Sequence, residues 1–168
     1  LFENFYYLLE NYLTYEVLPA ICESMHLLES LEHAWVTFSR RIVVLINVFL
    51  YLDRTYVLKT QRLQTLMQTS LNLFKECIVK QAPVRGRLVN DLLCLIGRDR
   101  RGDASVRHDL IKSCTGMLST LQVYSAIFEI AFLCETEDLY KSEGKALMKE
   151  GNFVKYLKCV EQFLTKEH

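Results

Sequence analysis

The chain has 168 residues, of which 51% are hydrophobic and 24% charged, and its formal net charge is zero. That length and hydrophobic content suit one ordinary domain or a few stacked helical repeats with a sizeable core. A net charge of zero argues against a general electrostatic attraction to nucleic acid or to an anionic membrane. No apolar run reaches the length of a membrane-spanning helix, and no N-terminal signal pattern is present. We therefore expect neither a membrane nor a nucleic acid as a direct partner.

Apolar residues recur at helical spacing along the chain, and no long stretch alternates with the period of two that a strand needs. Two prolines and six glycines leave little turn material. Eight or so helices with short connections predict an all-α protein. No strict internal repeat supports a short-period solenoid. In chain order, the predicted helices cover residues 2–15, 21–31, 31–58, 60–79, 87–96, 106–118, 121–149 and 153–164.

A few residues predict where these helices begin and end. Pro19 should end or kink the first helix, because proline lacks the backbone N–H and clashes with the preceding turn. Pro83 marks a break before the fifth helix. The stretch GRDRRGDAS at 97–105 is the clearest predicted loop. Ser105 is the expected N-cap of the next helix, with Asp109 in its first turn, where a carboxylate is favoured.

The first helix has a broad predicted apolar face. Its members are Phe2, Phe5, Leu9, Tyr12 and Leu13, widened by Tyr6, Tyr7 and Tyr15. The chain opens inside this pattern, with Leu1 in place of a methionine and no capping residue. We therefore expect it to be a piece of a longer protein.

The most apolar segment is IVVLINVFLYL at 42–52, in which Asn47 is the one polar residue. Its helix has two apolar faces, and a helix that is apolar on both sides is covered on both sides. The first face should pack into its own bundle, whereas the second needs a neighbouring helix pair or another protein. The first face contains Trp35, Phe38, Ile42, Leu45, Phe49, Leu52 and Tyr56. The second contains Val44, Val48 and Tyr51.

The six cysteines form no Cys-x-x-Cys pair, and each lies in an apolar helical context. Free cysteine behaves as a small hydrophobic residue. We therefore predict buried, unpaired cysteines and an intracellular, reducing compartment. They are Cys22, Cys77, Cys94, Cys114, Cys134 and Cys159.

Patterns that would indicate chemistry are weak. There is no Gly-rich phosphate loop and no recognisable Ser, His, Asp order. His26 and His33 lie near one helical face with Glu29 between them, but no third ligand stands at a telling spacing. We predict ordinary surface or interface histidines. No catalytic residue, metal site or cofactor is therefore expected.

Two charge clusters are also interpreted as solvent-exposed surface rather than as functional sites. An acidic cluster without a cleft is typical of a solvated helix face. Arginines around a loop are more often a solvated helix end than a phosphate site, and no stacking aromatic lies among them. The acidic cluster is Glu135, Glu137 and Asp138. The basic residues are Lys80, Arg85, Arg87, Arg98, Arg100, Arg101, Arg107 and Lys112.

One long run resembles a known family. AWVTFSRRIVVLINVFLYLDRTYVLKT at 34–60 is similar to the long fifth helix of the first repeat of a cullin, which a Trp opens and a segment close to YLDRTYV closes. The similarity continues in order along nearly the whole chain, and LDRTYVL and LQVYSAIFE look most like cullin-4 among the cullins. Departures are Pro19, where a continuous helix or short loop is expected, and Gly97, where an acidic residue is common. The other matching segments are LVNDLLCLIGRDRRGD, LQVYSAIFEIAFLCETEDLYKSEG and NFVKYLKCVEQFL.

The resemblance implies stacked helical bundles of the cullin-repeat type, in a fragment of an elongated stalk. Residues 1–59 would be the C-terminal helices of the first cullin repeat and residues 60–168 the second. Cullins are non-catalytic scaffolds of nuclear and cytoplasmic ubiquitin ligases. They hold a substrate adaptor at one end, while a separate C-terminal domain, unmatched in this chain, recruits the RING protein and carries the lysine modified by a ubiquitin-like protein.

The resemblance also implies a binding site. The family's adaptor surface uses the second and fifth helices of the first repeat, and only the fifth is matched here. For a cullin-4-like chain the implied adaptor is the large β-propeller protein of the damaged-DNA-binding ligases. The implied adaptor-binding residues are Val44, Asn47, Val48, Tyr51 and Thr55.

The residues alone leave alternatives open. Tyr51 could instead be buried inside its own repeat. A generic α-helical repeat module outside the cullin family would bind an unrelated helix or peptide through the same surface. An all-α enzyme with a cleft between helices is a third possibility, from a different class.

Overall fold

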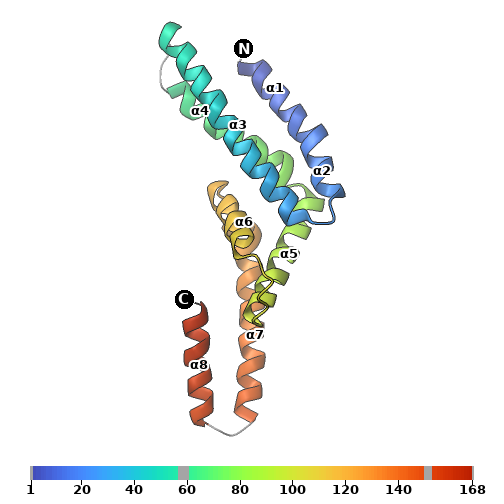
Figure 1. Cartoon of the computed structure of the whole chain (residues 1–168), viewed down its shortest axis with the longest axis vertical. Coiled ribbons are helices and arrows are strands. Elements are labelled where there is room, and N and C mark those ends of the chain that lie inside the picture. The colour runs from blue at the N-terminus through green and yellow to red at the C-terminus, as the bar shows by residue number, and fades with distance from the viewer. Residues whose placement is uncertain (1, 57–60, 150–152, 168) are drawn as a thin grey trace. The chain divides into compact units, whose positions relative to one another are not determined.

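A computed structural model describes residues 2–56, 61–149 and 153–167, and within them leaves aside the side chains of 2–3, 50–56, 61–65, 153–155, 164 and 166–167. All secondary structure in these ranges is helical, so the predicted all-α class is confirmed (Figure 1). Three of the helical segments, labelled η, are π-helical turns. The elements are α1 (Phe2–Tyr12), η1 (Leu13–Val17), α2 (Leu18–Glu23), α3 (Leu27–Tyr56), α4 (Gln61–Phe74), η2 (Lys75–Val79), α5 (Ala82–Arg100), α6 (His108–Thr120), η3 (Ser125–Glu129), α7 (Ile130–Lys149) and α8 (Phe153–Glu167).

The chain forms two compact units, Leu1–Phe128 and Glu129–His168. These units are defined by contacts, whereas the expected cullin repeats are defined by sequence. The predicted boundary between repeats at 59/60 lies outside the described residues, so it stays a prediction.

Pro19 does not end the first helix, which was one of the two predicted outcomes, but the regular α-helix is interrupted by the π-helical turn η1 just before it. The backbone stays helical from α1 through η1 into α2, and extended geometry first returns at Ser24. In the turn before the proline, the N–H of Leu18 donates to the carbonyl of Leu13, five residues back. This wide π-helical turn accommodates a residue that has no N–H of its own.

The corner between α2 and α3 falls inside the helix predicted at 21–31. Ser24 leaves the helical region with ψ 135°, and α3 begins at Leu27. The Ser24 hydroxyl accepts a hydrogen bond from the N–H of His26 at 3.1 Å, which satisfies a backbone donor ahead of the new helix. The predicted helix 31–58 therefore starts four residues earlier than expected.

The break predicted at Pro83 is present at Lys80–Gln81, between η2 and α5, but the new helix starts earlier than expected. Pro83 lies in the first turn of α5, where a missing N–H costs nothing because that donor has no partner within the helix. The helix consequently runs from Ala82 to Arg100, well beyond the predicted range of 87–96.

The loop predicted at 97–105 starts later, because Gly102 rather than Gly97 ends α5. Gly102 has φ +81°, and its N–H donates to the Asp99 carbonyl at 2.8 Å. The N–H of Asp103 donates to the Arg98 carbonyl at 3.1 Å, which completes a Schellman motif.

Ser105 is not the N-cap of α6, so that prediction is wrong. Its N–H and hydroxyl both donate to Asp103 Oδ1, at 2.9 and 2.6 Å. The helix instead starts at His108, with Arg107 at the cap position and no capping side chain. Asp109 does lie in the first turn, as predicted.

A second Schellman motif ends α6 and separates it from the helix predicted at 121–149. The N–H of Gln122 donates to the Ser119 carbonyl at 3.0 Å, and that of Val123 to the Leu118 carbonyl at 3.0 Å. Gln122 has φ +56°, a conformation that side chains with a Cβ rarely adopt.

Substitutions at these two turns should change the free energy of unfolding in opposite directions. Gln122→Gly should raise the free energy of unfolding by about 1 kcal/mol, because glycine adopts positive φ without the steric cost. Gly102→Ala should lower it by a similar amount, about 1 kcal/mol. Urea unfolding followed by circular dichroism measures both. Equal effects of the same sign would contradict the backbone explanation.

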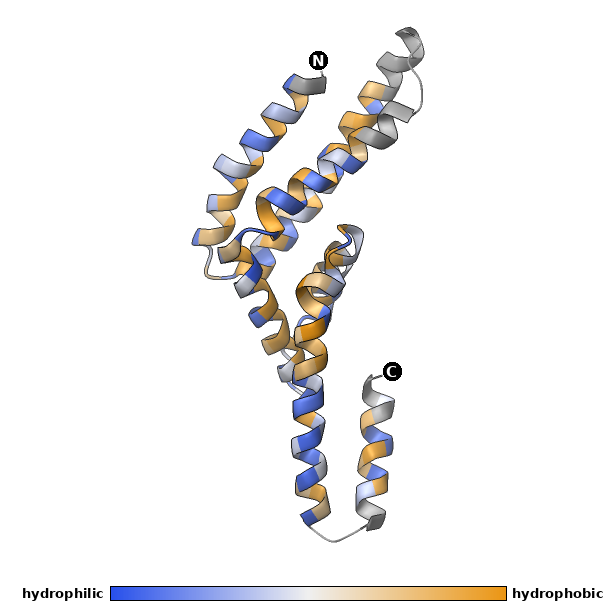
Figure 2. Ribbon diagram, turned by 180° about the vertical axis from the view of Figure 1, so that it is seen from behind, coloured by the Kyte–Doolittle hydropathy of each residue, from blue (hydrophilic) through white to orange (hydrophobic). Residues whose placement is uncertain are grey.

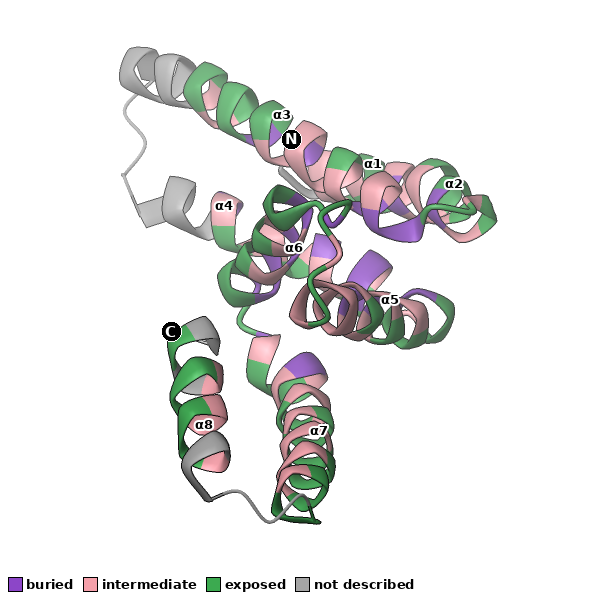
Figure 3. Ribbon diagram, turned by 60° about the horizontal axis from the view of Figure 1, so that its bottom comes forward, coloured by how far each residue is buried: buried purple, intermediate pink, exposed green. Residues whose placement is uncertain are grey.

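The core of the first unit lies where its helices face one another, as the buried segments of α2, α3, α5 and α6 show (Figure 3). Phe74 at the end of α4 is fully buried, and its ring centroid lies 4.7 Å from that of Phe38 and 5.2 Å from that of Trp35. Helix α3 contacts α2, α4, α5 and α6, so it is the central element of this unit. The other large, fully buried side chains are Leu13, Ile21, Leu27, Leu31, Ile42, Leu66, Ile78, Leu88, Leu92, Met117 and Phe128.

The second unit is a pair of contacting helices, α7 and α8, joined by an aromatic contact between Tyr140 and Phe163 at 5.3 Å. Figure 2 shows hydrophobic residues in the first turns of α7 and mainly hydrophilic ones beyond. Among the described side chains of α7, none is buried. Ile130, Leu133 and Met148 are all exposed.

All six cysteines are free, but burial holds for only one of them. Cys114 is buried, Cys94 and Cys134 are exposed, and the other three are half-buried. An apolar helical context therefore does not place a cysteine in the core.

Within the described residues, no single helix has the length and hydropathy to cross a membrane. The bent pair formed by α6 and η3–α7 has that length and hydropathy only when both helices are counted together.

Candidate functional site

The first apolar face of α3 packs into the unit, largely as predicted. Phe38 and Ile42 are buried, Trp35 stacks on Phe38 with centroids 6.2 Å apart, and Phe49 meets Phe5 of α1 edge to face at 5.8 Å. Leu45 departs from the prediction because it is exposed. Leu52 and Tyr56 belong to α3, but their side chains lie outside the described residues.

The second apolar face of α3 is open. Val44 is 60% exposed, Val48 is 52% exposed, and Asn47 beside them is exposed too. The other two predicted contact residues, Tyr51 and Thr55, are part of α3, but their side chains lie outside the described residues. Val43 is also exposed, and its helical position next to Val44 widens this face. The three described contact residues therefore share a solvent-exposed surface.

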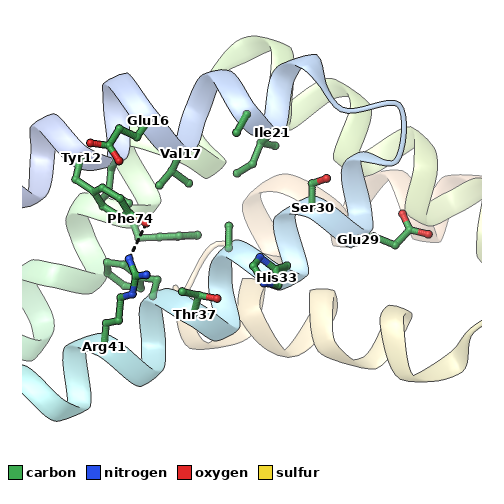
Figure 4. Close-up of a pocket in the computed structure, with 14 residues that line it drawn as sticks. Tyr12, Glu16, Val17, Ile21, Glu29, Ser30, His33, Thr37, Arg41 and Phe74 are labelled. Carbon is green, nitrogen blue, oxygen red and sulfur yellow. Dashed lines mark hydrogen bonds between the residues drawn. The ribbon is translucent and has the colours of Figure 1, made fainter.

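A groove of about 510 Å³ continues from this face toward the start of α3, between α3 and the α1–η1–α2 segment (Figure 4). Phe38 and Phe74 contribute apolar lining, together with Leu13 and Ile21 from the opposite segment. Thr37 and Arg41 of α3 line it as well, on the same stripe of the helix as Val44 and Val48.

One side-chain pair bridges the groove. Arg41 Nη1 donates a hydrogen bond to the Tyr12 hydroxyl at 3.0 Å, and its guanidinium carbon lies 5.8 Å from the centroid of the Tyr12 ring. The hydrogen bond and the cation–π contact together tie α1 to α3. This groove was missed by the sequence analysis, because periodicity describes one helix at a time.

On the outer face of α1 and η1, another prediction is wrong. Tyr7 and Tyr15 were expected to widen the buried face, yet they are 65% and 75% exposed. Leu8 is exposed as well, while Leu9 and Tyr12 are half-buried. The helix is apolar over more of its circumference than the described unit covers.

The described histidines and the acidic cluster on α7 lie at the surface, as the sequence predicted. His26 and His33 are both exposed, and His33 lines the groove. No set of three metal-ligating side chains lies together in the part of the chain that the structure describes. Glu137 pairs with Lys141, at 2.6 Å and one helical turn away, and the hydrogen bond from Lys141 lowers the pKa of the Glu137 carboxyl.

Two arginines of the basic segment around the α5–α6 loop, Arg98 and Arg107, are paired with nearby acids. Arg98 lies 2.8 Å from Asp103, whose pKa falls to about 2, chiefly through its hydrogen bond from the Ser105 hydroxyl and further through Arg98. Arg107 contacts Asp109 at 3.2 Å and Glu32 at 3.7 Å. Basic side chains that are already paired in this way give little net attraction for phosphates.

In the part of the chain that the structure describes, the geometry is that of an all-helical protein with an uncovered apolar helix face. The family model described as "Cullin alpha solenoid domain" matches residues 1–168, so the chain belongs to the cullin family. This excludes the alternative of a helical-repeat module outside that family.

Individual relatives agree with the resemblance to cullin-4. The chain is 36% identical to human Cullin-4A over 161 residues, which are 94% of this chain and 21% of that protein. It is 32% identical to Cullin-4 of Dictyostelium discoideum over 152 residues, 90% of this chain and 19% of that one. Identity to Cullin-3A of Arabidopsis thaliana is lower, 29% over 142 residues, which are 83% of this chain and 19% of that protein. The chain thus spans about a fifth of the length of the relatives it matches.

Proposed function

We propose that this chain is part of the non-catalytic scaffold of a cullin-RING ubiquitin ligase. It would hold the substrate-receptor adaptor and set the distance of that adaptor from the catalytic end. The mechanism is geometric, because a stiff spacer raises the effective concentration of the reacting groups without taking part in the chemistry. The RING protein would be recruited by the C-terminal domain that the family resemblance implies.

The observation that carries this proposal is the exposure of Val44 and Val48 on a helix whose opposite side is packed. Burying a fully exposed valine side chain is worth about 1.5–3 kcal/mol. Since Val44 and Val48 are each a little over half exposed, a partner that covers both gains roughly that amount in total. Asn47 would give the patch a polar contact that helps to orient the partner. Tyr51 would be the aromatic anchor, since amphipathic aromatics often dominate interface energies.

The partner we favour is a β-propeller adaptor of the damaged-DNA-binding type. This choice rests on the higher identity to cullin-4 relatives than to the cullin-3 relative. A function in ubiquitin-dependent protein degradation and in the DNA damage response, in nucleus and cytoplasm, would follow from that partner.

Replacing Val48 with aspartate tests the proposal. A charge buried at the interface without a partner costs about 3–5 kcal/mol, so co-purification of the parent protein with the β-propeller adaptor should be lost. Helicity by circular dichroism should be unchanged, because the side chain is half in solvent already. Tyr51→Asp should have the same effect.

Met148→Asp is the matched control. Met148 is an exposed apolar residue on α7, in the other compact unit, so this charge should leave adaptor binding intact. Wild-type binding by both Val48→Asp and Tyr51→Asp would place the contact elsewhere. Loss of binding by Met148→Asp would show that any added surface charge is harmful.

A further inference from the structure

The corner between α2 and α3 is held by a side chain from far along the sequence. Arg87 of α5 donates from Nη1 to the Cys22 carbonyl at 3.0 Å and from Nη2 to the Ser24 carbonyl at 2.9 Å. The partners are 65 and 63 residues away in the chain, and all three residues belong to the first compact unit. Both acceptors are at the C-terminal end of α2, where backbone carbonyls lack helical partners.

The same corner is contacted from α6. The Cys114 thiol lies 4.0 Å from the Leu28 carbonyl in the first turn of α3. One turn further, Glu32 faces Arg107 at 3.7 Å. Beneath these polar contacts, Leu27 and Leu28 are buried. The start of α3 is therefore the point at which the N-terminal helices meet α5 and α6.

The two kinds of contact constrain the corner differently. Apolar burial favours contact but is non-directional, so packed helices can slide or rotate slightly at small cost. A hydrogen bond requires both a distance and an angle. Because the Arg87 guanidinium is planar and reaches two carbonyls at once, it fixes the end of α2 in both position and direction. Ser24 links this end to α3, because its hydroxyl accepts a hydrogen bond from Ser30 Oγ at 2.7 Å.

We propose that Arg87 is a positioning residue, which fixes the direction of α3 relative to α5 and thereby the direction in which the exposed Val44 and Val48 face points. The functional part rests on the scaffold role proposed above, since a spacer delivers its cargo accurately only if its joints are stiff. The positive charge of Arg87 is also favourable at the negative end of the α2 dipole. A lysine would supply that charge but not the two-pronged geometry.

The test uses the full parent protein, with and without bound adaptor. Spectroscopic labels carried by unnatural amino acids at Arg40 of α3 and Asn90 of α5, both exposed, report the distance between the two helices. Arg87→Lys and Arg87→Met should each broaden this distance distribution, with the lysine variant intermediate. Adaptor affinity should change by less than about twofold, whereas ubiquitin transfer to an adaptor-bound substrate should slow by about threefold to tenfold.

Arg98→Lys is the matched control. Arg98 lies on the same helix and also makes two side-chain hydrogen bonds, but its partners Asp103 and Ser105 are in the adjoining loop. The distance between α3 and α5 should therefore stay as in the wild type. If both Arg87 variants kept the wild-type distribution, or if Arg98→Lys broadened it equally, Arg87 would not be a positioning residue.

The outcome can be separated from that of the scaffold proposal. The distance measurement without adaptor depends only on the joint, whereas Val48→Asp tests adaptor binding. A broadened distribution in the Arg87 variants, together with unaffected adaptor binding in both Val48→Asp and Tyr51→Asp, would support the positioning role of Arg87 and reject the proposed contact face. Should Arg87→Met not fold, Arg87→Lys still decides the question, because it retains the aliphatic stem and the charge.

Discussion

Phe74→Ala is expected to lower the free energy of unfolding by about 3–5 kcal/mol, the range for a phenylalanine removed from a packed core. Phe74 is fully buried, and its ring packs against Phe38 and Trp35 of α3. The deletion therefore removes both transfer free energy and aromatic contacts, and leaves a cavity under the groove. Urea unfolding of the first unit, followed by circular dichroism, would give the change directly.

Two further variants serve as controls for this expectation. Phe74→Leu keeps most of the volume and should cost clearly less than Phe74→Ala. Leu133→Ala removes an exposed side chain from α7 and should stay within about 0.5 kcal/mol of the wild type. A loss below about 1 kcal/mol for Phe74→Ala would mean that α4 does not anchor α3.

Cys114 should be almost inert to alkylation in the folded protein. Burial, with smaller contributions from Glu32 and Glu29, raises the pKa of its thiol from 9.0 to about 12. At pH 8 the reactive thiolate is then about a thousandfold rarer than for a thiol of ordinary pKa, before access is considered. Iodoacetamide labelling followed by mass spectrometry measures the rate at each cysteine.

Cys94 and Cys134 are internal controls because both are exposed and should label readily. Addition of urea should make Cys114 react like the others.

The raised pKa of the Cys114 thiol also makes stability depend on pH. The stabilisation that comes from keeping the Cys114 thiol protonated and buried is fully present below pH 9. It is lost as the pH rises toward 12, because the thiol gives up its proton more easily in the unfolded chain than in the folded one. Rapid labelling of Cys114 without unfolding would contradict its burial.

Periodicity predicted the helices and the buried face of α3 because a packed helix repeats its apolar residues with its own pitch. Phe38 and Ile42 are buried for that reason, and the valines on the far side are exposed. Periodicity could not reveal which apolar residues lack a cover. Tyr7 and Tyr15 fit an apolar face as well as Leu13 does, yet only Leu13 is buried.

Helix ends were predicted less well, since they depend on geometry that single residues do not determine. A proline is tolerated after a wide turn, as at Pro19, or in a first turn, as at Pro83. Of two nearby glycines, Gly102 rather than Gly97 takes positive φ. The fork from Arg87 to Cys22 and Ser24 joins residues more than sixty positions apart, and no local pattern marks such a pair.

The wide turn at η1 has a consequence for comparing this chain with its relatives. A π-helical turn holds one residue more than the α-helix it interrupts, and each residue of an α-helix advances the side chains by about 100°. Apolar positions before Leu13 and after Val17 therefore follow the same pitch but out of phase with one another. A relative that lacks this turn should align through a one-residue gap at 13–17, and a gapless alignment would assign one of the two flanking faces to the wrong side.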